Sequence, residues 1–159
     1  MVELAKNNGA TATCDSSDFE LQSFLPYRLS VVTNRISRDF SRHYSQAFGL
    51  SIPEWRVLAV LGAFAPLSSN EICERTAMDK AKVSRAVTAL RHKGYLTRAA
   101  NAKDHRLIAL SHSPAGRAVF EEIIPLARRL EAQLTSALAP GERAQLEILL
   151  AKLERAITT

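Results

Sequence analysis

The chain is poor in the residues and segments that mark secreted, membrane and metal-binding proteins. It has only two cysteines in 159 residues, Cys14 and Cys73, too few for a disulfide framework or a cysteine metal cluster. No apolar run approaches the roughly 18 residues of a membrane-spanning helix. The N-terminal segment lacks the basic and apolar regions of a secretory signal. We therefore expect a cytoplasmic protein that holds no metal and does not associate with a membrane.

Motifs of common enzyme classes are also missing. The sequence contains no Gly-x-Ser-x-Gly, no His-Glu-x-x-His and no glycine-rich loop of the kind that cradles phosphate. The four histidines, at positions 43, 92, 105 and 112, are scattered along the chain. These absences predict a protein that is not an enzyme and needs no cofactor.

Positive charge is concentrated in one stretch of the chain. Residues 75–106 contain nine Lys or Arg and two Asp, a local net charge of +7, whereas the whole chain carries +5. Such a stretch is typical of a protein that binds a polyanion, because each phosphate that it neutralises releases condensed counterions. The alternative is a charged face that is merely solvated. The pattern of residues within the stretch distinguishes the two.

The predicted fold is mainly α-helical with one small β-hairpin. Apolar residues recur at helical spacings from residue 24 onward, and the sequences 51–54 and 68–71 have the Ser-x-x-Glu pattern of a capping box. Asp79 is placed to cap a further helix, and the apolar run 55–64 is expected to be buried. The predicted helices span 24–49, 51–64, 68–75, 79–93 and 113–138 and begin again at 140, and the predicted strands span 95–99 and 107–110.

Two short helices, a basic helix and a hairpin follow one another in the order of a winged helix-turn-helix. The basic helix has two different faces. One face is apolar and suits packing against the preceding helix, with Val83, Ala86, Val87 and Leu90. The opposite face combines small residues, which allow close approach to DNA, with cationic and hydroxyl residues, which donate hydrogen bonds to bases and phosphates. Its members are Ala81, Lys82, Ser84, Arg85, Thr88 and Ala89. This combination favours nucleic acid over a solvated face.

Residues 79–98 resemble the recognition helix and first wing strand of MarR-type transcriptional regulators, and residues 101–116 resemble that family's wing and the start of its fifth helix. The family's wing pattern is Asp-x-Arg-x-x-Arg, and Asn101, Lys103 and Arg106 stand at those positions. Lys is more strongly hydrated than Arg and gives up more solvation on entering a narrow minor groove. Two roles for Lys103 therefore stay open: entry into the minor groove, or contact with phosphate only. Asp104 either orients Arg106 toward DNA or only braces the hairpin.

The resemblance implies a homodimeric, sequence-specific regulator of a pseudo-palindromic double-stranded DNA operator, either a repressor or an activator, with repressor preferred. It implies helical dimerisation segments over 23–50 and 113–159 and a winged helix-turn-helix lobe over 51–112. Residues 1–22 are polar and small, and this composition predicts a mobile arm. The residues expected at the DNA are Lys80, Lys82, Ser84, Arg85, Thr88, Arg91, Arg98, Lys103, Asp104 and Arg106.

The resemblance also implies release from DNA by a small effector bound between the dimerisation helices and the lobe. The segments 25–28 and 53–56 are similar to the branch that controls breakdown of aromatic acids, so the expected effector is an aromatic acid or its thioester. Aromatic walls and cations near the first two helices supply the expected ligand residues: Tyr27, Ser30, Arg35, Trp55 and Arg56. For Trp55, a place in the core is the preferred interpretation.

Two other functions remain open from the sequence. The first is a thiol-based redox sensor, for which Cys14 lies in the expected arm and Cys73 on the expected buried side of the third helix. The second is an architectural protein that binds DNA without sequence preference and without an effector. An architectural protein would show neither sequence preference nor a response to a ligand, unlike the effector-released regulator described above. A redox sensor would respond to oxidation of a thiol instead of to an aromatic ligand.

Overall fold

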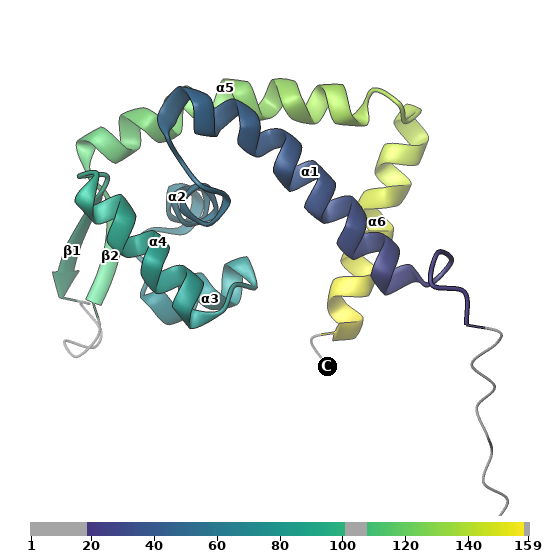
Figure 1. Ribbon diagram of the computed structural model, residues 1–159, viewed down its shortest axis with the longest axis horizontal. Helices are drawn as coiled ribbons and strands as arrows, with labels where there is room; N and C mark the ends of the chain where they lie inside the picture. Colours follow the sequence, from purple (N-terminus) through teal and green to yellow (C-terminus); the bar gives the residue numbers. More distant parts are fainter. Residues whose placement is uncertain (1–18, 101–107, 158–159) are drawn as a thin grey trace, which may run out of the picture. The chain divides into compact units, whose positions relative to one another are not determined.

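The structure is a computed structural model that describes residues 19–100 and 108–157. The chain divides into two units, Met1–Arg35 and Ile36–Thr159. The elements along the chain (Figure 1) are α1 (Leu25–Phe48), α2 (Ile52–Phe64), α3 (Ser69–Thr76), α4 (Lys80–His92), β1 (Leu96–Ala100), β2 (Ile108–His112), α5 (Pro114–Thr135) and α6 (Pro140–Ile157). The predicted fold class, mainly helical with one hairpin wing, is confirmed.

The starts of the lobe helices are set by local capping, as the sequence predicts. At the start of α2, the Ser51 hydroxyl accepts from the Glu54 N–H at 3.4 Å, and the Glu54 carboxylate accepts from the Ser51 N–H at 2.7 Å. Ser68 and Glu71 form the same reciprocal pair at the start of α3. Asp79 accepts from the Lys82 N–H at 2.7 Å at the start of α4. Each contact satisfies a backbone donor that the first helical turn leaves free.

Helix α5 ends at Thr135, earlier than the predicted Leu138. The hydroxyls of Thr135 and Ser136 donate to the carbonyls of Glu131 and Gln133, at 2.9 and 2.8 Å. Hydroxyls that bind nearby carbonyls in this way compete with the helical hydrogen bonds. The spacing of apolar residues, which predicted a longer helix, carries no information about these side-chain hydrogen bonds.

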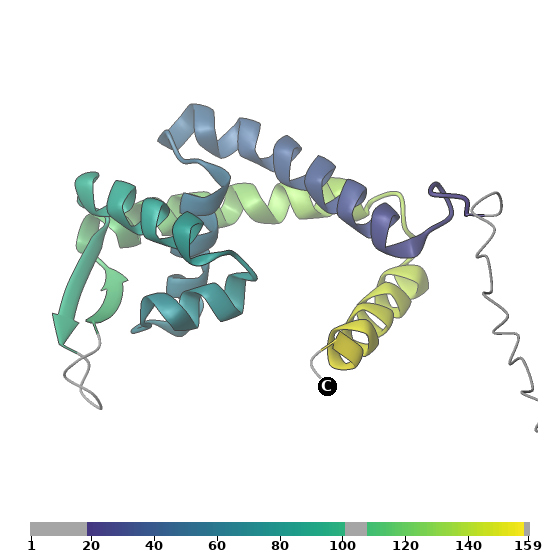
Figure 2. The ribbon, with the colours of Figure 1, turned by 60° about the horizontal axis from the view of Figure 1, so that its bottom comes forward.

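The core of the lobe lies between α2, α3 and α4, which pack on one another with the hairpin beside α4 (Figures 1 and 2). The apolar face predicted for α4 is buried, with Val83 and Leu90 fully enclosed. The prediction that the run 55–64 is buried throughout is wrong at its end, because Phe64 is 52% exposed. Its ring lies under the Arg75 guanidinium, 4.1 Å from ring centroid to cation, and this contact covers part of an aromatic surface outside the core.

The hairpin pairs Leu96 with His112 and Arg98 with Leu110 in an antiparallel register. Both strands are displaced from the predicted spans by one or two residues, because backbone pairing continues through polar Ser111 and His112, which the apolar pattern does not reveal. Leu110 also exchanges two backbone hydrogen bonds with Leu67, of 3.1 and 2.8 Å, which fixes the hairpin to the turn before α3.

Within 19–100 and 108–157, no single helix is long and apolar enough to cross a membrane. Helices α1 and α2 pass that test of length and composition only as a bent pair.

Candidate nucleic-acid interface and adjoining pocket

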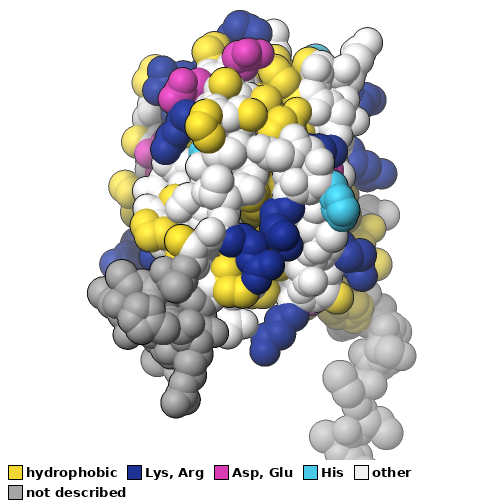
Figure 3. All heavy atoms as spheres, turned by 90° about the vertical axis from the view of Figure 1, so that its left-hand side faces the viewer, with side chains coloured by type: hydrophobic (Ala, Val, Ile, Leu, Met, Phe, Trp, Pro, Cys, Tyr) yellow, Lys and Arg dark blue, Asp and Glu magenta, His cyan; other side chains and the backbone are white. Residues whose placement is uncertain are grey.

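Helix α4 presents a polar, cationic face to solvent. Lys80, Lys82, Ser84, Arg85 and Thr88 are all exposed, as predicted. Ala89, expected on the same face, is only half-exposed, because it lies at the margin of the buried face. Figure 3 shows Lys and Arg side chains gathered over this side of the lobe, with acidic side chains mostly toward its top. The arrangement offers donors to an anionic partner over an apolar support.

The cations of this face differ in how far they are paired. Lys82 Nζ lies 3.0 Å from the Asp79 carboxylate, and both side chains are more than half exposed. Hydrogen bonds from the Lys82 backbone and side chain hold the Asp79 pKa below its usual range. An exposed pair of this kind is weak, so Lys82 can leave it for an acceptor on a partner. Among the described residues, Lys80 and Arg85 form no ion pair.

Arg91 and Arg98 extend the cationic surface from the end of α4 onto β1, and both are exposed. The other predicted wing residues, Lys103, Asp104 and Arg106, lie outside the described residues, as does His105. Their proposed contacts with DNA therefore remain predictions.

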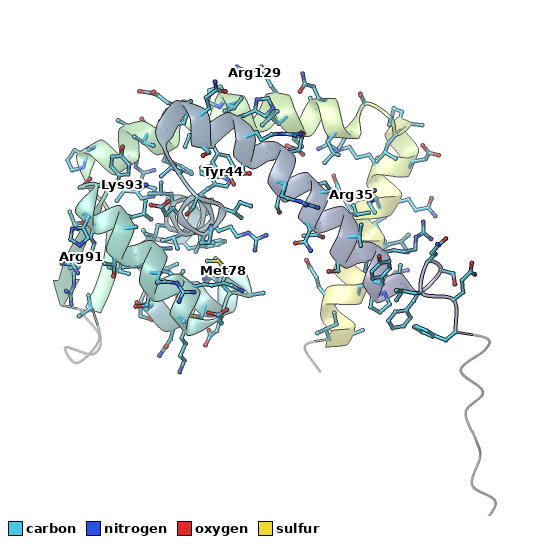
Figure 4. All side chains as sticks on the ribbon, viewed as in Figure 1. Arg35, Tyr44, Met78, Arg91, Lys93 and Arg129 are labelled. Carbon is cyan, nitrogen blue, oxygen red and sulfur yellow. The ribbon has the colours of Figure 1, made fainter. Side chains whose placement is uncertain are left out.

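Lys93 belongs to the basic stretch by sequence but does not belong to this surface. Its Nζ lies 2.6 Å from Glu54 Oε1 and donates to the Gly49 carbonyl at 2.8 Å. The Glu54 side chain is only 8% exposed. Burial would raise the Glu54 pKa, but hydrogen bonds from Lys93 and Ser51 outweigh it and hold the pKa below its ordinary value. One of the nine cations is thus committed to a partly buried ion pair with Glu54. Figure 4 labels Lys93.

A pocket of about 120 Å³ lies between α1 and the first turns of α2. Trp55, the only tryptophan of the chain, forms one wall, with its ring 5.9 Å from that of Tyr44. Arg56 donates to the Ser37 hydroxyl at 3.3 Å at the polar edge. Tyr44 points from α1 toward α2 (Figure 4). The complete lining is Ile36, Ser37, Phe40, Tyr44, Ile52, Trp55 and Arg56.

The chemistry of this pocket combines aromatic walls with a cation. Burial raises the pKa of Tyr44 to about 12, against the opposing field of Arg56, so its hydroxyl stays protonated and able to donate. Two of the five predicted ligand residues, Trp55 and Arg56, line the pocket. The other three, Tyr27, Ser30 and Arg35, are exposed residues of the first unit.

A second hollow, of about 370 Å³, lies between α1 and α5 and is lined by His43, Gln46, Ala47, Phe48, Glu122, Leu126 and Arg129. Its lining has Arg129 together with the acid Glu122 and one aromatic ring, that of Phe48, whereas the pocket at Trp55 has several aromatic side chains, a cation and no acid. The pocket at Trp55 therefore suits an aromatic anion better.

The aromatic cluster continues from the pocket to a histidine that the sequence pattern does not single out. Phe120 stacks on Trp55 at 6.2 Å and contacts His112 at 5.2 Å. His112 Nε2 bonds to the Leu58 carbonyl at 2.9 Å, while its Nδ1 is buried and has no hydrogen-bond partner in the described part of the chain. Burial lowers the His112 pKa, although the bond to Leu58 opposes this. The ring is therefore held neutral, with Nε2 as the donor.

Comparison with known proteins identifies the family. The model of the MarR family matches residues 48–107. The repressor MdtR of Bacillus subtilis is 32% identical over 111 residues, which cover 70% of this chain and 72% of MdtR. The chain belongs to the MarR family.

Solved structures of MarR proteins agree with this assignment. A MarR/EmrR family regulator from Acinetobacter sp. ADP1 superposes with a TM-score of 0.81 at 28% identity, covering 88% of this chain and 99% of that one. BpsR of Bordetella bronchiseptica, whose DNA binding is regulated by 6-hydroxynicotinic acid, shares the fold with a TM-score of 0.75 at 24% identity, covering 86% and 96%. As a MarR-family member, the protein is a DNA-binding transcriptional regulator.

Proposed function

We propose that the protein is a homodimeric repressor that reads a pseudo-palindromic operator with α4 and the hairpin, and that a small aromatic acid or its thioester releases it. The observation that carries this proposal is the division of α4 into a fully buried apolar face and an exposed face of small, hydroxyl and cationic residues. A helix of this kind is anchored on the lobe while its outer face enters the major groove.

The residues of the proposed interface have different roles. The residues that we assign to base edges lie on the outward face, where arginine can form bidentate contacts with guanine: Lys82, Ser84, Arg85 and Thr88. We assign Lys80, in the first turn of α4, to phosphate. Phosphate contacts fix the register of the protein on DNA, whereas base contacts carry the specificity. Arg91, Arg98, Lys103, Asp104 and Arg106 complete the proposed set as phosphate or wing residues.

The proposed dimerisation segments are 23–50 and 113–159, on either side of the lobe at 51–112. Helix α6 supports this division because none of its described residues is buried, although it carries a row of leucines. Leu146, Leu149 and Leu150 are 45%, 48% and 41% exposed. Apolar rows of this size on a soluble regulator indicate a protein–protein contact, and a second copy arranged about a two-fold axis matches the symmetry of a pseudo-palindrome.

The pocket at Trp55 supports a single-ring aromatic effector. An apolar protein cavity of about 150 Å³ accommodates benzene, so a pocket of about 120 Å³ suits one ring and excludes two without rearrangement. Arg56 at its edge is placed for a carboxylate, because guanidinium binds carboxylate with paired hydrogen bonds. A thioester would place only its acyl ring inside. These features favour the breakdown of aromatic acids as the process that the protein regulates.

The experiment is fluorescence anisotropy of the protein on DNA from upstream of its own gene and on random DNA of equal length. A panel of single-ring aromatic acids, with 6-hydroxynicotinic acid and the matching thioesters, is then titrated into the complexes. We expect preference for the upstream DNA and release by one panel member that also quenches Trp55. Equal binding to both DNAs with no effect of any compound would instead establish the architectural function.

The redox-sensing alternative receives no support from Cys73, which is half-buried and packs against the core. Such a thiol behaves as a small apolar side chain. Cys14 lies outside the described residues.

A further inference from the structure

The C-terminal end of α4 is held from two sides by consecutive residues. On one side, Lys93 contacts Glu54 at 2.6 Å and the Gly49 carbonyl at 2.8 Å. On the other, the Gly94 carbonyl accepts from the Ser113 hydroxyl at 2.6 Å. The proposed recognition helix is therefore attached at its C-terminal end to the residue after α1, to the start of α2 and to the start of α5.

Glu54 has both carboxylate oxygens engaged. Oε1 takes the Lys93 ammonium, while Oε2 accepts the Ser51 N–H that closes the capping box of α2. The carboxylate therefore cannot follow Lys93 without opening the first turn of α2. A displacement of that turn must change the Glu54–Lys93 contact.

The second acceptor of Lys93 lies just beyond the end of α1. Gly49 follows the last residue of α1 and has a positive φ of 62°, a conformation that glycine adopts at helix ends without strain. The Lys93 ammonium thus bridges the end of α1 and the start of α2. Its geometry depends on the distance between these two ends.

The pocket lies between the same two helices. Ile52, Trp55 and Arg56 flank Glu54 on α2, and Tyr44, on the opposite wall, lies in the last turns of α1. A ligand that moved the first turn of α2 away from the end of α1 would therefore also move Glu54 relative to Gly49, the two partners of Lys93. No other ion pair among residues 19–100 and 108–157 joins α2 to the end of α4.

We propose that Lys93 is a positioning residue that transmits the state of the pocket at Trp55 to the recognition helix α4. The part of this proposal that concerns an effector rests on the proposed function. The pair is only partly buried, with the Lys93 side chain 33% exposed. Removal of both charges of such a pair is often close to neutral for stability, so a contribution to folding alone gives no reason for this particular pair. Its two acceptors, one in the first turn of α2 and one just beyond the end of α1, give it a geometric role.

Linkage makes the proposal testable without knowledge of the effector. If pocket and α4 are coupled, DNA bound at α4 must alter the pocket, because coupling between two sites is reciprocal. Trp55 is the only tryptophan and lies in the pocket, not on the α4 surface. Its emission therefore reports the pocket while anisotropy of labelled DNA reports binding.

The experiment compares the full-length wild type with the double variant Glu54→Gln, Lys93→Met. The double variant removes both charges together, because Lys93→Met alone would leave the buried Glu54 carboxylate unpaired and endanger folding. After Glu54→Gln, the side-chain amide oxygen at this position can still accept the Ser51 N–H. A matched control, Glu131→Gln with Arg143→Met, removes an exposed pair of 2.8 Å between α5 and α6. Because both residues lie in a proposed dimerisation segment, sedimentation confirms that the control assembles like the wild type. Thermal melts confirm that all three proteins are folded.

We expect operator DNA to shift Trp55 emission in the wild type and the control, in step with the anisotropy. In the double variant the DNA still binds but the shift is abolished. A full shift in the double variant, or no shift in a wild type that binds operator, would overturn the proposal. Failure of the proposed function has a different signature, namely no operator preference or no release by any aromatic acid.

Discussion

The substitution Gly116→Ala tests how closely α5 is attached to the end of the recognition helix. A Cβ at position 116 would lie 1.9 Å from the Tyr95 carbonyl oxygen and 2.8 Å from its carbonyl carbon. Favourable contacts between non-bonded carbon atoms lie at about 3.5–4.0 Å, so α5 and Tyr95 must separate by on the order of 1 Å. Both sides of the clash are backbone, which cannot rotate away as a side chain can.

The expected loss of stability follows from the interactions at this point. The Ser113 N–H bonds to the Tyr95 carbonyl at 2.9 Å, and the Gly116 N–H bonds to the Ser113 hydroxyl at 3.0 Å. Overpacking costs about 1–3 kcal/mol, and each hydrogen bond that breaks costs about 1 kcal/mol. Alanine returns at most about 1 kcal/mol of helix propensity. We therefore expect a net loss of about 2–4 kcal/mol.

Denaturant and thermal unfolding, followed by circular dichroism, measure this loss. For a chain of this size, 1 kcal/mol corresponds to a change of about 2–4 °C in Tm, so Gly116→Ala should lower Tm by roughly 4–16 °C. Gly141→Ala is the matched control, because Gly141 also lies in the first turn of a helix but has no atom within 4 Å of the added Cβ. A Gly116→Ala variant as stable as Gly141→Ala would refute the close approach of α5 to Tyr95.

Three further predictions concern DNA binding, pH and assembly. Lys80→Ala should weaken operator and random DNA alike and reduce the slope of log K against log salt by about 0.9 for each phosphate that is no longer neutralised; a weakening confined to the operator would argue that Lys80 binds a base instead. The lowered His112 pKa, with Arg117 and Glu121 facing the ring, means that the unfolded chain binds the proton first. Stability should therefore fall as the pH drops below about 6.5. In thermal melts across pH, His112→Leu should flatten this dependence, whereas His92→Gln, at an exposed histidine, should leave it in place. An unchanged profile in His112→Leu would contradict the assignment of the pH dependence to His112. Leu150→Glu should give a folded monomer in sedimentation, because burying an unpaired carboxylate at the interface costs several kcal/mol; a persistent dimer would exclude α6 from the interface.

Features governed by neighbouring residues are predictable from the sequence. The capping boxes at Ser51 and Ser68 and the cap at Asp79 depend on residues three positions apart, and all three form as predicted. The two faces of α4 follow from helical spacing alone, so its buried side is also predicted correctly.

Features governed by residues that are distant in the sequence could not be predicted from it. Lys93 looks like one more DNA-binding cation, and only the fold brings it to Glu54, 39 positions earlier. His112 likewise meets Leu58 across 54 positions. The close approach that requires glycine at position 116 depends on the path of Tyr95. Pairings of this kind are set by how elements pack, and no local pattern encodes them.

The central claim is that the outer face of α4 reads sequence, and the specificity ratio of Arg85→Ala tests it most directly. Operator and random DNA affinities are measured for the wild type and the variant at one salt concentration. Removal of a base-reading side chain should cost about 1–3 kcal/mol on the operator, or roughly 5–150-fold, and leave random DNA much less affected, so that the ratio falls. An equal weakening on both DNAs would show that Arg85 binds only phosphate and would contradict the assignment of α4 as the reading element.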